Sequence, residues 1–220
     1  MVRNRKFFEG ISKDILDIKK ENKEIIVVDA GSGTGILGAF SLYLGANKCY
    51  FLEDNPYSLE LSKKLIGYLG FMEKSIFIEC DATNYSLPEK YDICISETLS
   101  SGFVDEDFPF IINNLKQFGK NDSIIIPSQF EIVITEISPP DKGELEGVNY
   151  KHHFLFKAKN GFKKKRIKLK NKNSQKISFK TKAYIYEDIF IESGDCMSFL
   201  NERVLDVRKD KHPLFEFINI

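Results

Sequence analysis

The chain has 220 residues, enough for one large domain or for a domain with a small appendage around a substantial core. Its 32 basic and 32 acidic residues cancel, so no overall field selects a polyanionic partner. No segment approaches the roughly 18 uninterrupted apolar residues of a membrane span, and the N-terminus has no apolar signal core, so we expect no membrane association.

The first 127 residues alternate short apolar runs with amphipathic segments. An N-terminal helix is predicted over 4–20, and three further helices over 36–44, 56–69 and 106–118. Strands are predicted at 25–28, 48–53, 75–79, 91–96 and 123–126. This alternation predicts right-handed crossovers and a parallel sheet, which gives an α/β, Rossmann-like domain over 1–127. Ligands of such sheets bind at the carboxyl ends of the strands.

After Pro127 the pattern changes to an alternation of apolar and polar residues. The strand-like segments are 130–137, 150–158, 166–170 and 177–191. We predict an antiparallel β appendage over 128–220 on the substrate side.

Four cysteines are spread along the chain without C-x-x-C spacing: Cys49, Cys80, Cys94 and Cys196. Cys49 and Cys94 lie in predicted strands and Cys80 directly follows one, where cysteine usually behaves as a small buried apolar side chain. We therefore expect free thiols, no metal site and a cytoplasmic location.

Residues 25–35, IIVVDAGSGTG, are the stretch around which the chain is organised. A β-branched run ends in Asp29, and glycines follow at 31, 33 and 35, where the backbone can turn sharply and approach a ligand. The predicted helix 36–44 then presents its free N-terminal amides to that turn. A turn with a purely structural role is the alternative interpretation, because a lone glycine motif is a weak signal.

The surroundings of this motif indicate a nucleoside-containing cofactor. Glu53 ends the next strand, about twenty residues on, where a carboxylate can accept both hydroxyls of a ribose. NAD sites favour G-x-G-x-x-G, but here the third glycine comes one residue early and Asp29 precedes the first. The pattern resembles that of class I S-adenosylmethionine methyltransferases, which implies that Asp29, Gly31, Gly33 and Gly35 hold the methionine end. We expect S-adenosylmethionine, with NAD as the alternative.

Two further strand ends carry candidate residues. Asp81 is placed to accept the adenine amino group while Ala82 offers a backbone amide, although Asp81 can also simply close a turn. Glu97 ends the fourth strand, where the transferable methyl should lie. A carboxylate there can orient a nitrogen nucleophile and accept its proton.

From Val2 to about Ile137 the chain resembles the protein arginine methyltransferases. The matching segments, in order, are Val2-Arg3 with Phe7, the stretch DAGSGTGIL at 29–37, Gly-Ala-Asn-Lys at 45–48 before Glu53, Ile-Ser-Glu at 95–97 and Ile-Pro-Ser at 126–128.

This resemblance implies that Arg3 grips the cofactor carboxylate. It also implies that Glu97 and a second glutamate nine residues later, Glu106, clamp a guanidinium. Glu106 lies in an Asp-Glu-Asp run, and acids there would also favour a helix N-terminus.

The appendage departs from that family. Ile-Ser-Phe at 177–179 stands where the family has Thr-His-Trp, and no insertion of the size of its dimerisation arm lies between Ile137 and Tyr150. The sequence leaves the oligomeric state open.

Two other features have a structural and a functional interpretation. His152 lies on an apolar face, where a core role is favoured over catalysis, whereas His153 and His212 are expected on the surface. The stretch 157–176 has ten basic residues, no acidic residue and one aromatic, Phe162. A solvated hairpin is therefore favoured over a nucleic-acid surface.

Three functions follow. The first is N-methylation of a small guanidino or amino compound, favoured by the short appendage. The second is methylation of arginine in a protein or peptide. The third is a cofactor-binding scaffold that acts on RNA or a partner subunit.

Overall fold

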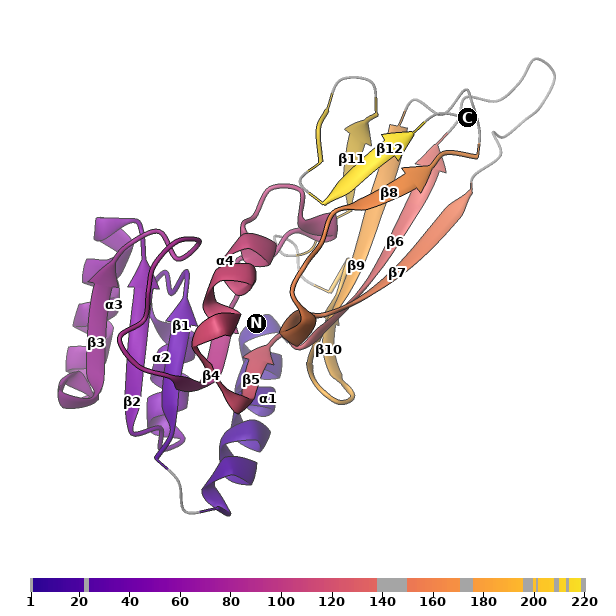
Figure 1. Cartoon of the computed structure of the whole chain (residues 1–220). Coiled ribbons are helices and arrows are strands. Elements are labelled where there is room, and N and C mark those ends of the chain that lie inside the picture. The colour runs from indigo at the N-terminus through magenta and orange to yellow at the C-terminus, as the bar shows by residue number, and fades with distance from the viewer. Residues whose placement is uncertain are drawn as a thin grey trace.

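The computed structural model describes residues 2–21, 24–137, 150–170, 176–195, 200, 202–207, 210–212 and 214–218. Two lobes lie side by side, each built on a β-sheet, and the N-terminal helix α1 contacts both (Figure 1). None of the helices in these ranges is long and apolar enough to cross a membrane.

The first lobe contains sheet A, a parallel sheet with strand order β3-β2-β1-β4-β5. Its strands are β1 (Ile26–Ala30), β2 (Lys48–Glu53), β3 (Ser75–Glu79), β4 (Tyr91–Ser96) and β5 (Gly119–Ile126). The helices that connect them are α2 (Ile36–Tyr43), α3 (Pro56–Tyr68) and α4 (Phe108–Leu115). Every residue of β4 is buried, as is nearly all of β1, as expected for central parallel strands. The predicted Rossmann-like sheet is confirmed.

Local chemistry explains where α3 begins. Asn55 is its N-cap, and its side-chain oxygen accepts hydrogen bonds from the backbone amides of Tyr57 and Ser58 at 3.0 and 3.2 Å. Pro56 then occupies the first helical turn, where its missing N–H costs nothing.

The second lobe contains sheet B, an antiparallel sheet with strand order β10-β9-β6-β7. These strands are β6 (Gln129–Ile137), β7 (Lys151–Lys157), β9 (Lys176–Tyr186) and β10 (Ile189–Glu192). The antiparallel appendage is confirmed. Two short strands were not predicted: β11 (Arg203–Asp206), which pairs with β9, and β12 (Phe215–Ile218), which pairs in parallel with β8 (Lys165–Lys168). The division at 127/128 stays a prediction.

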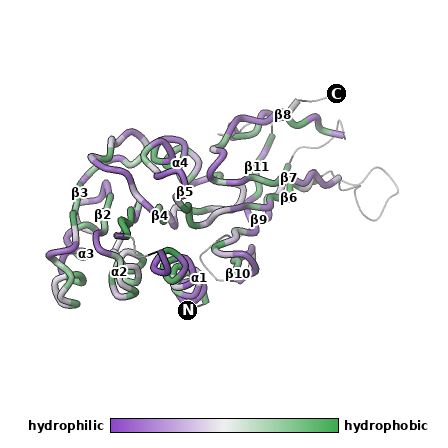
Figure 2. The backbone as a smooth tube through the Cα atoms, turned by 60° about the horizontal axis from the view of Figure 1, so that its bottom comes forward, coloured by the Kyte–Doolittle hydropathy of each residue, from purple (hydrophilic) through white to green (hydrophobic). Residues whose placement is uncertain are grey.

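Aromatic rings join the two lobes. Phe103, which precedes α4, packs edge-on against Phe130 of β6 and Phe162, with ring centroids 5.0 and 5.2 Å apart. Such pairs contribute about 0.5–1.5 kcal/mol beyond the area that they bury. Figure 2 shows the hydrophobic residues along β4 and β5 beside this junction.

Helix α1 (Val2–Lys19) packs its apolar side inward, where Phe7, Ile11 and Ile15 are fully buried. Gly10 allows close approach to β9, because a Cβ at this position would collide with Ile185. The position of α1 fixes the residue near its start, Arg3, relative to both lobes.

Two predictions about single residues have different outcomes. Cys49 and Cys94 are buried and Cys80 is half-buried, all as free thiols, whereas Cys196 lies outside the described residues. His212, expected on the surface, is instead 5% exposed, so that expectation is wrong. Its Nδ1 accepts hydrogen bonds from the amides of Leu214 and Phe215, and its ring stacks on Phe179. Burial lowers its pKa to about 4.

Candidate cofactor and catalytic site

The glycine turn after β1 has the backbone that the sequence predicts. Gly31, Gly33 and Gly35 have φ of 67, 54 and 76°, in the left-handed region that favours glycine. A Cβ at Gly31 would collide with Thr98, and one at Gly35 with Ser62, whereas no atom lies within 4 Å of a Cβ built on Gly33. The turn is therefore packed at both ends and open in the middle.

Glu53 holds this turn from the tip of β2. Its Oε2 accepts a hydrogen bond from the Gly33 amide at 2.7 Å, and its Oε1 accepts one from the Asn55 amide at 3.1 Å. The carboxylate is thereby fixed at the carboxyl edge of sheet A. The contact with a ribose stays a prediction.

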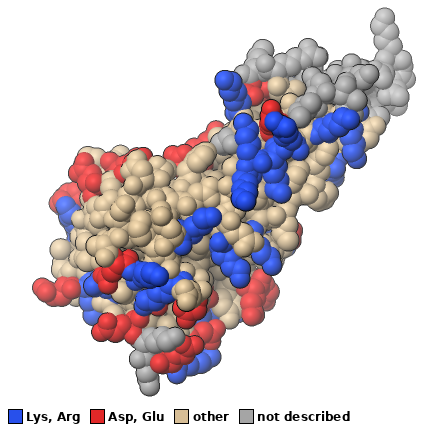
Figure 3. Space-filling view, viewed as in Figure 1, with Lys and Arg blue, Asp and Glu red and all other residues tan. Residues whose placement is uncertain are grey.

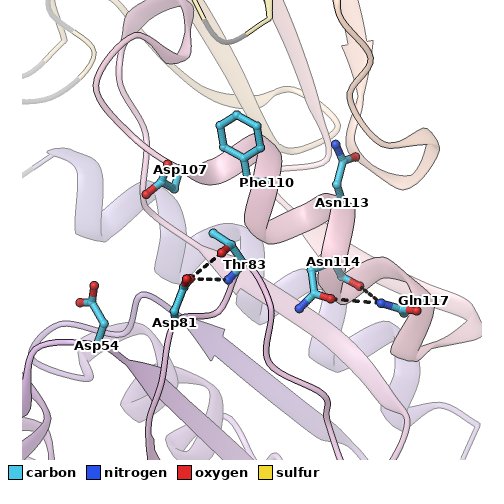
Figure 4. Close-up of a pocket in the computed structure, with 8 residues that line it drawn as sticks. All are labelled: Asp54, Asp81, Thr83, Asp107, Phe110, Asn113, Asn114 and Gln117. Carbon is cyan, nitrogen blue, oxygen red and sulfur yellow. Dashed lines mark hydrogen bonds between the residues drawn. The ribbon is translucent and has the colours of Figure 1, made fainter.

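A cavity of about 240 Å³ opens at this edge of the sheet. Five of the predicted site residues line it: Gly31, Glu53, Asp81, Ala82 and Glu106. A wider groove of about 760 Å³ adjoins it and shares Asp54, Asp81, Thr83 and Asp107 with it (Figure 4).

Asp81 accepts hydrogen bonds from residues of its own loop. Its Oδ1 accepts hydrogen bonds from the amide and the hydroxyl of Thr83 at 2.8 and 2.7 Å (Figure 4). Its Oδ2 accepts one from the Asn84 side chain. These hydrogen bonds lower the pKa of Asp81. The aspartate closes a turn while facing the cavity, and its adenine contact stays a prediction. The Ala82 carbonyl accepts a hydrogen bond from Asn114 of α4 at 3.0 Å, which ties this loop to the helix.

Glu97 lies at the end of β4 beside Arg3. The Arg3 guanidinium donates a hydrogen bond from Nη1 to Oε1 of Glu97 at 2.9 Å. Burial raises the pKa of Glu97 to about 7, Arg3 opposes this shift, and the nearby charge of Glu106 adds to it. The pKa of Glu106 is also raised, by partial burial and by the flanking Asp107 and Asp105. The fold thus brings Glu97 and Glu106 within electrostatic reach of each other.

The loop between these glutamates is anchored to sheet B. Ser101 donates a hydrogen bond from its hydroxyl to the Leu200 carbonyl at 2.7 Å, and the Gly102 amide donates to the Thr181 hydroxyl at 2.8 Å. Gly102 has a φ of 69°, and a Cβ there would collide with Phe179. The position of Glu106 therefore depends on β9 in the second lobe.

The structure gives limited support to the alternative role of Glu106, that of an acidic residue which stabilises a helix N-terminus. The N-cap residue of α4 is Asp107, and it makes no side-chain capping hydrogen bond. Glu106 precedes it, is exposed and lines the cavity. Its catalytic role stays a prediction.

A family model described as PRMT5 arginine-N-methyltransferase matches residues 2–126. The chain belongs to this arginine N-methyltransferase family. The match covers α1, the whole of sheet A and both glutamates.

Individual relatives agree with this assignment. An uncharacterized protein of Methanocaldococcus jannaschii is 33% identical over 110 residues, which are 49% of this chain and 42% of that protein. Protein arginine N-methyltransferase 7 of Mus musculus is 28% identical over 110 residues, which are 47% of this chain and 16% of that protein. The matched segment is thus less than half the length of these relatives.

Solved structures show the shared fold. Arabidopsis thaliana protein arginine methyltransferase 10 has a TM-score of 0.67 at 13% identity, covering 94% of this chain and 79% of that chain. The Trypanosoma brucei PRMT1 enzyme-prozyme complex with AdoHcy has a TM-score of 0.63 at 14% identity, covering 94% and 74%.

In this arginine N-methyltransferase family member, Asp29 faces the helix that follows it. The residue is 1% exposed, its Oδ2 accepts a hydrogen bond from the Gly38 amide of α2 at 2.8 Å, and burial raises its pKa to about 7. Asp29 therefore fixes α2 to the end of β1, and its contact with the methionine end stays a prediction.

His152 has the structural role that was favoured. Its Nε2 lies 2.7 Å from Oε1 of Glu136, a fully buried carboxylate that also accepts hydrogen bonds from the Lys170 amide. This pair lies toward the end of β6 that is away from its junction with β5 (Figure 1).

Several residues that line the cavity were not singled out from the sequence. Asp54 and Thr83 adjoin predicted residues, so the same strand-end argument could have included them. Ile111 of α4 does not follow a predicted strand, so this argument could not have found it. It lines the cavity because α4 packs over the strand ends.

Proposed function

We propose that this protein transfers a methyl group from S-adenosylmethionine to a guanidinium nitrogen of arginine in a protein or peptide. The observation that carries the proposal is the pair Glu97 and Glu106, held at either end of an anchored loop beside the cavity. The family match supports it. The first hypothesis, a small guanidino or amino acceptor, has no support among these relatives, which are protein arginine N-methyltransferases where they are characterised.

The residues present fit the cofactor. The turn is open at Gly33, and the Ser32 hydroxyl beside it is buried without a hydrogen-bond partner among the described residues. Glu53 would hold the ribose, Asp81 and Ala82 the adenine, and Arg3 with the glycine turn the methionine end. When bound, the cofactor supplies a methyl group activated by a sulfonium.

The two glutamates would prepare the acceptor. A guanidinium stays protonated at neutral pH, so none of its nitrogens has a free lone pair. Two carboxylates can confine its charge to one side and leave the remaining nitrogen nucleophilic. Arg3 positions the Glu97 carboxylate through the 2.9 Å hydrogen bond.

Methylation of the nitrogen releases one proton, which a neighbouring carboxylate can accept. Glu97 is suited to this step because its pKa of about 7 lies near neutral pH. The proton then passes to solvent.

The test compares acceptors directly. The protein is incubated with methyl-labelled S-adenosylmethionine and an arginine-containing peptide, the same peptide with lysine for arginine, or free arginine. We expect label in the arginine peptide alone. Label in free arginine but not in the peptide would refute the proposed acceptor and restore the small-molecule hypothesis.

A further inference from the structure

One face of the second lobe is strongly basic. Residues 150–170 contain no acidic residue, and nine exposed basic side chains project from them: Lys151, Lys157, Lys159, Lys163, Lys164, Lys165, Arg166, Lys168 and Lys170. We call these nine residues the basic face. Figure 3 shows lysine and arginine side chains gathered over β8 and over the turn before it. Only Arg166 among the nine has an ion pair within the described residues, with Glu216 at 2.9 Å.

A groove of about 340 Å³ borders the basic face where the two lobes meet. Ile124 and Ile125 of β5 form its apolar part, and Lys157 of β7 and Lys159 also line it. Within the described residues, β5 is the last strand of sheet A and β7 is the last strand of sheet B. Two strand edges therefore flank one groove.

These features favour a peptide over a nucleic acid. An edge strand presents backbone N–H and C=O groups that an extended peptide can pair with. Nonspecific sites for single-stranded nucleic acid add exposed aromatic rings for base stacking. Over residues 150–170 the only exposed large apolar side chain is Leu155, which is not aromatic.

We propose that the groove between β5 and β7 binds an extended acidic segment of a protein partner, which pairs with the edge of β5 and sets its carboxylates against the basic face. An arginine-rich methyl acceptor would be repelled by the same lysines, so this surface selects a chemically different segment. The proposal does not depend on methyl transfer.

Binding of a fluorescein-labelled peptide of alternating glutamate and valine, followed by anisotropy, tests this. We expect saturable binding that weakens as salt rises. Lys157→Glu with Lys159→Glu should weaken it about tenfold, since two charge pairs become repulsive. Lys63→Glu with Lys64→Glu on α3 makes the same change in net charge on an exposed helix and should leave binding unchanged. Circular dichroism confirms that both variants fold.

Two comparison ligands separate the alternatives. A peptide with every backbone amide N-methylated cannot donate backbone hydrogen bonds to β5 from either of its edges and should bind more weakly than the parent peptide. Equal binding of both peptides would overturn strand addition. Tighter binding of oligouridylate RNA, lost in the Lys157/Lys159 variant, would assign the surface to nucleic acid instead. If none of these ligands binds, the basic face is only a solvated surface and the proposal is overturned.

Discussion

Asp14→Asn should make the stability of the protein less dependent on pH. Asp14 lies on the buried side of α1, is 6% exposed, and its Oδ2 has no hydrogen-bond partner among the described residues. Burial, with a smaller contribution from the Asp17 charge, raises its pKa from 3.8 to about 7. Asparagine keeps the shape of the side chain and removes the charge.

The magnitude follows from the shift in pKa. The pKa of Asp14 is higher in the folded protein than in the unfolded chain, so the folded protein keeps a proton on Asp14 that the unfolded chain has released. This proton binding stabilises the folded state, and the stabilisation is lost as pH rises through about 7. A shift from 3.8 to about 7 makes this contribution fall by roughly 2.5 kcal/mol between about pH 5 and about pH 8. Asp29 and Glu97 also titrate near neutral pH, but both proteins contain them, so the difference between variant and wild type isolates Asp14.

Urea unfolding of wild type and variant, followed by circular dichroism at both pH values, measures this difference. Glu9→Gln is the matched control, because Glu9 is an exposed acidic residue on the same helix and does not contribute to the raised pKa of Asp14. The Asp14 variant should become more stable relative to wild type as pH rises, and the control variant should not. Identical pH dependence of the Asp14 variant and wild type would refute the argument.

Further predictions concern the site. Gly33→Ala should weaken S-adenosylmethionine binding several-fold, because the φ of 54° at this position costs alanine about 1 kcal/mol or more and the new Cβ enters the open part of the turn. Calorimetry measures the affinity, and an unchanged value would contradict the assigned cofactor turn. The value of kcat/KM should fall tenfold per pH unit below about 7, since protonated Glu97 cannot hold a guanidinium; a flat profile would remove Glu97 from that role. Gly102→Ala should lower the Tm, because the new Cβ collides with Phe179 and the φ of 69° disfavours alanine, which together reduce the free energy of unfolding by roughly 2 kcal/mol. An unchanged Tm would show that the loop between Glu97 and Glu106 is not tightly packed.

The sheet A lobe could be predicted from sequence because its signals are local. A β-branched run, a capping asparagine and a proline each mark an element boundary without reference to the rest of the chain. The glycine turn and Glu53 follow from these strands, since parallel strands end at one edge of the sheet. Strands β11 and β12 could not be predicted in this way, because each has four residues and gains its strand conformation by pairing with β9 or β8.

The site residues that depend on packing between lobes were less predictable. The sequence around His212 is charged and suggests exposure, but Phe179 of β9 stacks on its ring and buries it. The spacing of Glu97 and Glu106 was visible in the sequence, whereas the anchoring of their loop by Thr181 and Leu200 depends on residues that follow it by about eighty to a hundred positions.

The most direct test of the proposed function is to locate the transferred methyl in an arginine-containing peptide by tandem mass spectrometry, using wild type, Glu97→Gln and Glu106→Gln, with cofactor affinity measured in parallel. We predict methyl on the guanidinium nitrogens with wild type, loss of transfer in both variants, and retained S-adenosylmethionine binding. Transfer to any other atom, or full turnover by the Glu106 variant, would contradict the two-glutamate clamp.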